Sequence, residues 1–138
     1  MPAKDIYHDS VRKALEKENW IITDDPLKLT WGRRDFFVDL GAKQLIAAQK
    51  GELKIAVEIK SFTGISQAIE LEKALAQYIL YRNILEEKEP DRLLYLAIIE
   101  DIFKEIFSEP IGNLVIKKNQ IKLLVVDEEL EVIAQWIN

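Results

Sequence analysis

Three charged residues lie within otherwise apolar stretches of the sequence: Asp39 in FFVDL, and Glu58 and Lys60 in LKIAVEIK. Two carboxylates that meet at one point repel each other unless a cation or a proton lies between them, and such oxygen ligands suit a hard divalent ion. An adjacent lysine can orient or deprotonate an attacking water, or stabilise charge on a phosphate oxygen. Brought together, these residues would be equipped for metal-dependent phosphodiester hydrolysis.

The segments that carry these residues are predicted to form a β-hairpin. Residues 36–49 and 53–60 each favour a strand, and QKGE between them has the length and glycine content of a tight turn. Successive side chains of a strand point to opposite faces, so Glu58 and Lys60 share one face. The midpoint between Asp39 and Glu58 falls between residues 48 and 49, close to the turn, so the hairpin would set the two carboxylates side by side.

A metal site at this point would use Asp39, Glu58 and the main-chain carbonyl of Ile59 as ligands for Mg²⁺ or Mn²⁺. Mg²⁺ keeps several waters, so a few protein oxygens are enough. The net charge of −5 argues mildly against a surface dedicated to phosphate, because affinity for a nucleic-acid backbone comes from Lys and Arg. A bound divalent cation would supply the positive charge that the chain itself lacks.

Composition and element order predict one α/β (α+β) domain over residues 1–138, a length typical of a single domain. The absence of Cys excludes disulfides and thiolate metal sites. The charged N-terminus and the lack of a long apolar run lead us to expect a cytoplasmic protein without a membrane partner. The expected elements, in chain order, are a helix over 6–18 capped by Asp5, a short strand and turn within 20–32, the predicted hairpin, a helix from Ser66 to about Glu87, a strand over 92–100, a short helix near 101–107, a turn near Pro110, and strands over 121–127 and 131–137.

The ordered set of Asp39 and Glu58-Ile59-Lys60 at a strand end, followed by a long helix, resembles the PD-(D/E)XK nuclease signature. Val38 stands where that signature usually has Pro. The resemblance implies a restriction-endonuclease-like three-layer core, in which a mixed β-sheet is flanked by helices and a β-hairpin carries the site. It also implies that Asp39 and Glu58 bind the metal and that Lys60 assists catalysis.

The predicted long helix adds a second part of this resemblance. Gln77 and Tyr81 match the QxxxY pattern that some of these nucleases carry after the lysine strand, where Gln77 would be catalytic by positioning Lys60 or the DNA backbone. In the same group an upstream helix can contribute a histidine, and His8 lies on such a predicted helix.

Over nearly its full length the chain also resembles the XisH family of element-excision controlling factors from cyanobacteria. The segments that carry the likeness are KDIYHDSVRKAL, VDLGAKQLIAAQKGELKIAVEIKSF, LEKALAQYILYRNILEEKEPDRLLYLAI and EVIAQWI. The resemblance implies site-specific removal of a DNA element during heterocyst differentiation, alongside a recombinase and a small companion protein, XisI. Family membership does not itself establish catalysis.

Each candidate residue also has a purely structural interpretation. Glu58 and Lys60 could form a solvated pair on the exposed face of an antiparallel sheet. Gln77 could be a polar position on an amphipathic helix, and Tyr81 a core aromatic residue whose hydroxyl reaches the surface. His8 could be a surface or capping residue.

Two function classes follow from the sequence. In the first, the protein is a Mg²⁺-dependent endodeoxyribonuclease, or part of one, and Arg33 and Arg34 contact DNA phosphates where they otherwise form an ordinary turn. In the second, the nuclease fold serves as a catalytically inactive binding module that controls a recombinase through protein contacts. A second copy of the chain is a further candidate partner, since Trp136 and Ile137 could belong to a contact surface.

Overall fold

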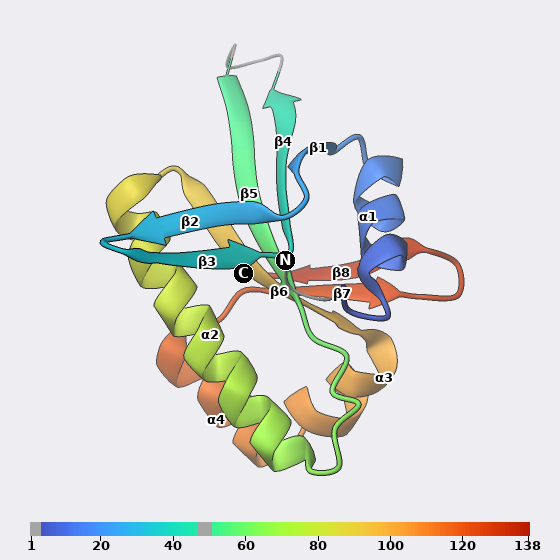
Figure 1. The fold of residues 1–138 in the computed structure, drawn as a ribbon. Helices are drawn as coiled ribbons and strands as arrows, with labels where there is room; N and C mark the ends of the chain where they lie inside the picture. Colours follow the sequence, from blue (N-terminus) through green and yellow to red (C-terminus); the bar gives the residue numbers. More distant parts are fainter. Residues whose placement is uncertain (1–3, 47–50) are drawn as a thin grey trace.

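The computed structural model describes residues 4–46 and 51–138 of the chain, with helices on both faces of a β-sheet (Figure 1). The helices are α1 (His8–Lys17), α2 (Gln67–Lys88), α3 (Glu100–Ile102), the π-helical turn η2 (Phe103–Phe107) and α4 (Pro110–Asn119). The strands are β1 (Ile21–Asp24), β2 (Leu27–Trp31), β3 (Arg34–Val38), β4 (Leu40–Ile46), β5 (Gly51–Ile59), β6 (Arg92–Ile99), β7 (Leu123–Asp127) and β8 (Val132–Ile137).

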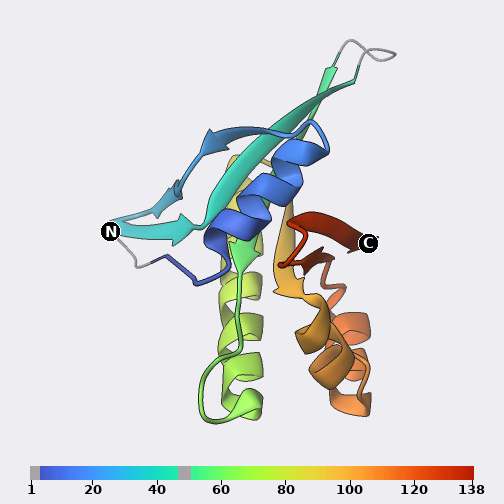
Figure 2. The ribbon, with the colours of Figure 1, turned by 90° about the vertical axis from the view of Figure 1, so that its right-hand side faces the viewer.

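Six strands form one mixed sheet in the order β1-β4-β5-β6-β7-β8. The central strands β5, β6 and β7 run parallel, and the outer pairs are antiparallel. The strands β2 and β3 form a separate antiparallel hairpin. Figure 2 shows β4 and β5 extending beyond the body of the molecule. The predicted mixed sheet flanked by helices is confirmed.

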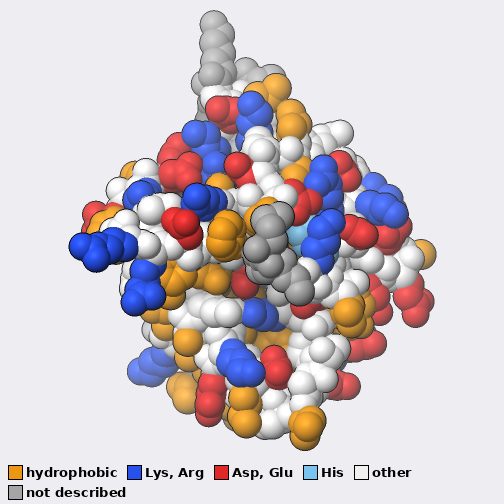
Figure 3. Space-filling model, in the orientation of Figure 1, with side chains coloured by type: hydrophobic (Ala, Val, Ile, Leu, Met, Phe, Trp, Pro, Cys, Tyr) orange, Lys and Arg blue, Asp and Glu red, His pale blue; other side chains and the backbone are white. Residues whose placement is uncertain are grey.

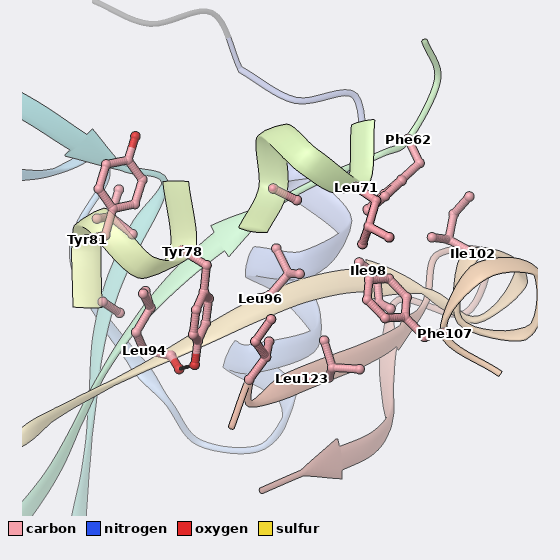
Figure 4. Close-up of a cluster of buried hydrophobic side chains, with 14 of the residues drawn as sticks. Phe62, Leu71, Tyr78, Tyr81, Leu94, Leu96, Ile98, Ile102, Phe107 and Leu123 are labelled. Carbon is pink, nitrogen blue, oxygen red and sulfur yellow. Dashed lines mark hydrogen bonds between the residues drawn. The ribbon is translucent and has the colours of Figure 1, made fainter. Parts of the chain in front are cut away.

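The sheet separates two apolar cores. One lies between the sheet and α1 and includes Leu15 and Leu124. The other lies on the opposite face, where α2 and η2 cover β6 and β7, and includes Tyr78, Leu96 and Phe107 (Figure 4). The β2–β3 hairpin packs into this second core as well, so the sheet is sandwiched between α1 on one side and α2 with the hairpin on the other.

The long helix α2 forms almost as predicted. The Ser66 side chain accepts a hydrogen bond from the main-chain N–H of Ile69 at 3.3 Å, which is the expected N-cap contact. The helix ends at Lys88, two residues before Pro90. The first helix starts two residues later than predicted, at His8, and its N-cap is Tyr7 instead of Asp5. The Asp5 side chain accepts a hydrogen bond from the Tyr7 N–H at 2.9 Å.

Three predicted elements were wrong. Residues 36–49 do not form one strand, because the chain leaves the β2–β3 sheet at Val38 and enters the six-stranded sheet at Leu40. The prediction for residues 20–32 had one strand too few, because a second strand, β2, follows the break at Asp25 and Pro26; Gly32, with a φ of 63°, then turns the chain tightly into β3. The turn expected near Pro110 is the ten-residue helix α4, with proline in its first turn.

Part of the predicted QKGE turn lies at residues 47–50, outside the described residues. Across residues 4–46 and 51–138, no helix combines the length and the apolar character needed to cross a bilayer.

Candidate functional site

Asp39 lies at the junction of the two sheets. It is the single residue between β3, which ends at Val38, and β4, which begins at Leu40. In the β4–β5 ladder Leu40 lies opposite Val57, so the next step along both strands brings Asp39 opposite Glu58. This is the register that the sequence predicts, and it brings the two carboxyl groups together.

Hydrogen bonds and an ion pair connect the residues of this charged cluster. The Asp39 N–H donates to Glu58 Oε1 at 3.3 Å, and the Ile59 N–H donates to Asp39 Oδ2 at 2.7 Å. Lys60 Nζ lies 3.6 Å from Glu58 Oε2. The structure therefore brings together Asp39, Glu58, Lys60 and the main chain of Ile59, which we call the carboxylate cluster.

The cluster lies inside the protein. Glu58 is only 6% exposed and lies on the central strand β5, so its interpretation as part of a solvated edge pair is wrong. Alternation along β5 sends Ile55 and Val57 into the core beneath α1, while Ala56 faces the core beneath α2. Glu58 and Lys60 continue the second face, as predicted, at the point where β5 ends.

Burial, together with the negative charge of the neighbouring Asp39, raises the pKa of Glu58 to about 8, although Lys60 opposes the shift. The pKa of Asp39 is also raised, mainly by burial. A hydrogen bond from the Ile59 N–H, a hydrogen bond with Glu58, and the charges of His8 and Lys60 oppose this second shift. Near neutral pH and without a cation, the pair therefore retains a proton.

This donor set fits a hard divalent cation. Two buried carboxyl groups share one ammonium group, so a cation that displaced the retained proton would balance the second negative charge. Within residues 4–46 and 51–138, no group of three or more His, Cys, Asp or Glu side chains is placed to hold a metal. A cation here would thus rest on Asp39 and Glu58, with main-chain and water oxygens as its other ligands, as Mg²⁺ commonly does.

Tyr81 of α2 borders the carboxylate cluster. Its ring packs against Phe36 of β3, with 6.4 Å between ring centroids. Burial, together with the charges of Glu58 and Asp39, raises the pKa of Tyr81 to about 12. In Figure 4 its hydroxyl points away from the apolar cluster, whereas the Tyr78 hydroxyl turns inward and donates to the Leu94 carbonyl at 2.8 Å.

Gln77 lies one helical turn before Tyr81 on α2. Its side-chain Oε1 is buried and accepts no hydrogen bond from the described residues. A buried amide oxygen without a donor is unfavourable, so this atom is suited to a donor supplied by a water, a substrate or a shifted lysine. That feature separates Gln77 from an ordinary polar position on a helix surface.

His8 belongs to a second polar cluster and is not at the surface. It is 3% exposed, and its Nε2 lies 2.8 Å from Asp25 Oδ1, while Arg12 Nη1 donates to Asp25 Oδ2 at 2.5 Å. His8 Nδ1 is buried without a hydrogen-bond partner in the described part of the chain. Asp25 and Arg12 were not predicted to be partners at this site, since only the fold brings the DDP segment against the first helix.

Arg33 and Arg34 lie at the tip of the β2–β3 hairpin. Arg33 follows Gly32 in the turn, and Arg34 begins β3; both are exposed. The turn interpretation thus holds for Arg33 but not for Arg34, and the proposed contact of the pair with DNA stays a prediction.

Comparisons with known proteins agree with this architecture. An XisH family protein from Nostoc punctiforme PCC 73102 is 40% identical, with a TM-score of 0.88 over 97% of this chain and 100% of that chain. A protein from Anabaena variabilis described as a fdxN element excision controlling factor is 43% identical, with a TM-score of 0.88 over 98% of this chain and 100% of that chain. No curated protein matches the chain.

The family described as XisH protein matches residues 1–134. The chain belongs to the XisH family. The resemblance of the sequence to the XisH family is confirmed, and both crystal structures share the overall fold of this chain.

Proposed function

We propose that this XisH protein is a metal-dependent DNA nuclease that acts in excision of a DNA element. The observation that carries the proposal is the buried pair of Asp39 and Glu58, two carboxyl groups on neighbouring strands with Lys60 as their adjacent cation. Such an arrangement is unfavourable as a purely structural feature, because burial penalises both charges and they repel each other. Perturbed carboxyl groups of this kind are common at functional sites.

The chain's own residues have separate roles in this proposal. Asp39 and Glu58 would hold Mg²⁺ or Mn²⁺ with the Ile59 carbonyl, and the ion would supply Lewis-acid stabilisation of a phosphate oxygen. Lys60 would leave its contact with Glu58 to orient or deprotonate the attacking water. The free Oε1 of Gln77 would accept a hydrogen bond from the Lys60 ammonium, and Tyr81 would close the side of the site toward α2.

We also propose that the core is restriction-endonuclease-like. Support comes from the parallel β5, β6 and β7, the helices on both faces of the sheet, and the position of the cluster where β5 ends. In this proposal His8 and the Arg33–Arg34 pair are supporting residues. An XisI-like companion and a site-specific recombinase are the proposed protein partners.

The test is cleavage of supercoiled DNA by the full chain in the presence of Mg²⁺ or Mn²⁺. Lys60→Ala should abolish cleavage while metal still raises the melting temperature, because the carboxylates remain. Lys54→Ala is the matched control and should cleave like wild type. Lys54 lies on the same strand, but its ammonium group pairs with Asp91, at 3.8 Å, and not with the cluster. Equal activity of Lys60→Ala and wild type would refute the proposed mechanism.

A second candidate is a binding module that controls a recombinase without cleaving DNA. It is favoured by the net charge of −5 and by the contact of Lys60 with Glu58, which already gives the cluster a partial counterion. Two results together would favour this candidate. The wild-type protein would leave supercoiled DNA intact in the presence of metal, both alone and after co-purification with an XisI-like protein. Millimolar Mn²⁺ would also leave its melting temperature unchanged.

A further inference from the structure

A groove of about 530 Å³ runs between the β2–β3 hairpin and the C-terminal half of α2. Trp31 and Phe36 line it from the hairpin, and Leu80 lines it from the helix. Trp31 is 52% exposed and Leu80 is 42% exposed, so large apolar surfaces remain open to solvent. We call this feature the hairpin groove.

Strand pairing explains why the groove opens at one end of the hairpin. Residues directly opposite in an antiparallel pair lie on the same face, and here Leu27 pairs with Val38, while Trp31 pairs with Arg34. The first pair is buried in the core beneath α2, and the last pair lies at the tip, where Arg34 is exposed. An indole and a guanidinium therefore stand side by side on the face that looks toward α2.

The α2 wall of the groove is mixed. Besides Leu80 and Ile84, it carries the amide of Asn83 and the carboxylates of Glu86 and Glu87. An apolar floor with aromatic rings and a few polar groups is typical of a small-ligand site, and the volume lies within the usual range of about 300–1,000 Å³. The groups on this wall can accept the N–H donors that nucleobase edges present.

Among the described residues that line the groove, the positive charge is that of Arg34 on the hairpin, whereas Glu86 and Glu87 on α2 are negative. Arg33 and Arg34 are exposed at the tip, whereas Lys28 is already paired with Asp35 at 3.5 Å. Figure 3 shows Lys and Arg side chains at the left, over the tip of the hairpin, with hydrophobic side chains between the hairpin and α2. A nucleotide would thus enter with its base against Trp31 and its phosphate toward the two arginines, away from Glu86.

Strand β3 links the hairpin groove to the carboxylate cluster. Phe36 lines the groove and packs against Tyr81, and Asp39 follows Phe36 by three residues along the same chain segment. From Arg34 to Asp39 the chain takes five residue steps, or at most about 18 Å when extended. This is the length of a few nucleotides of one strand.

We propose that the hairpin groove binds one unstacked nucleobase of the DNA strand whose backbone reaches the carboxylate cluster, so that the substrate is DNA with an unpaired stretch. The proposal rests on the proposed function, because it assigns the substrate class of that site. Base–aromatic stacking tolerates any base, so the groove selects unpaired structure and not sequence.

The test measures DNA binding without cleavage, in EDTA, with a short fluorescein-labelled oligothymidylate and a duplex of the same length. Wild type should bind the single strand more tightly than the duplex. Trp31→Ala should weaken single-strand binding about tenfold, as expected for the loss of one stacked base, whereas Trp31→Phe should stay within about threefold. Quenching of tryptophan emission by the oligonucleotide should disappear in Trp31→Phe, because Trp20 and Trp136 lie outside the groove.

Two variants on α4 serve as matched controls. Leu114→Ala removes a leucine that is also about half exposed, at 52%, and should bind like wild type. On the hairpin, Arg34→Ala should weaken single-strand binding and lower the slope of log affinity against log salt by about 0.7. Lys117 is an exposed cation on α4, so Lys117→Ala should change neither quantity. Melting temperatures of all variants show that the fold is retained.

The outcomes separate this inference from the proposed function. The inference is overturned if Trp31→Ala binds the single strand like wild type. It is also overturned if wild type prefers the duplex or binds no oligonucleotide, even if DNA is cleaved. Loss of a protein partner in Trp31→Ala with unchanged DNA binding also overturns it. Binding that depends on Trp31 in a protein that never cleaves supports the groove and refutes the nuclease.

Discussion

The structure contains two polar clusters whose charges are balanced differently. Around Asp25, one carboxylate accepts from Arg12 and pairs with His8, so each of its oxygens has its own partner. In the carboxylate cluster, Asp39 and Glu58 share the single ammonium group of Lys60. The Asp25 carboxylate is satisfied by side chains of the protein, whereas the carboxylate cluster needs a proton or an added cation.

This difference distinguishes structural from functional burial of charge. The Asp25 cluster ties α1 to the segment between β1 and β2, and its contacts suffice to explain it. In the carboxylate cluster the pKa values of Asp39 and Glu58 are raised by folding, so the folded state is destabilised when both carboxyl groups are ionised. The two clusters should therefore respond in opposite directions when a carboxylate is removed.

Removing the carboxylate of the satisfied cluster should have the largest effect on stability. Asp25→Ala leaves buried His8 and the Arg12 guanidinium without their acceptor, so the free energy of unfolding should fall by about 2–3 kcal/mol. Denaturant unfolding measures it. Asp35→Ala, which removes an exposed partner of Lys28, is the control and should change stability by less than about 1 kcal/mol. Equal effects of the two variants would contradict the contrast.

Glu58→Gln should instead stabilise the metal-free protein at alkaline pH. A carboxyl group whose folded pKa is raised contributes stability below its unfolded value of 4.5, and this contribution is lost as the pH rises through about 8. The variant should match wild type near pH 4 and exceed it by about 2 kcal/mol at alkaline pH, allowing for its lost contact with Lys60. Glu52→Gln, an exposed position on the same strand, should show no such pH dependence. A destabilised Glu58→Gln at alkaline pH would disprove the imbalance.

Metal should stabilise wild type more at high pH than at low pH. A divalent ion competes with the proton retained by Asp39 and Glu58, so binding strengthens as the pH approaches about 8. At a tenfold excess over its dissociation constant, Mn²⁺ should add about 1.4 kcal/mol. Thermal melting with Mn²⁺ and then with excess EDTA measures this gain and its reversal. A shift that persists in Glu58→Gln would place the metal elsewhere.

The smallest effect is expected from the hydroxyl of Tyr81. Tyr81→Phe leaves the ring packed against Phe36 and should change the free energy of unfolding by less than about 0.5 kcal/mol. Tyr78→Phe removes a hydroxyl that donates to the Leu94 carbonyl and accepts from the Lys122 N–H, so it should cost about 1–2 kcal/mol. Denaturant unfolding of both variants compares them directly, and a larger loss in Tyr81→Phe would mean that its hydroxyl stabilises the carboxylates.

The sequence predicts the geometry of the carboxylate cluster well because that geometry depends on local rules. Alternation along β5 places Glu58 and Lys60 on one face, and the position of the turn fixes Asp39 opposite Glu58. The capping of α2 at Ser66 is likewise local. Periodicity and turn position suffice for such features without knowledge of the tertiary fold.

Other features depend on tertiary contacts and were missed. Residues 36–49 read as one strand, because nothing in their pattern marks the change of sheet at Asp39. The pairing of His8 with Asp25 joins residues 17 positions apart through packing of α1 against the segment between β1 and β2. The β2–β3 hairpin did have a local signal, since Gly32 follows the alternating segment LKLTW.

The single-residue junction between the two sheets makes Asp39 a pivot. Any tilt of the β2–β3 hairpin against the six-stranded sheet has to be absorbed by rotation about the backbone bonds of this residue, because no longer linker separates β3 from β4. The arm that such a tilt would move carries Trp31 and Arg34 at its far end. A ligand that bound at the hairpin tip and tilted the hairpin would thus change the orientation of the Asp39 carboxyl group. Binding at the tip would in this way affect the geometry of the carboxylate cluster.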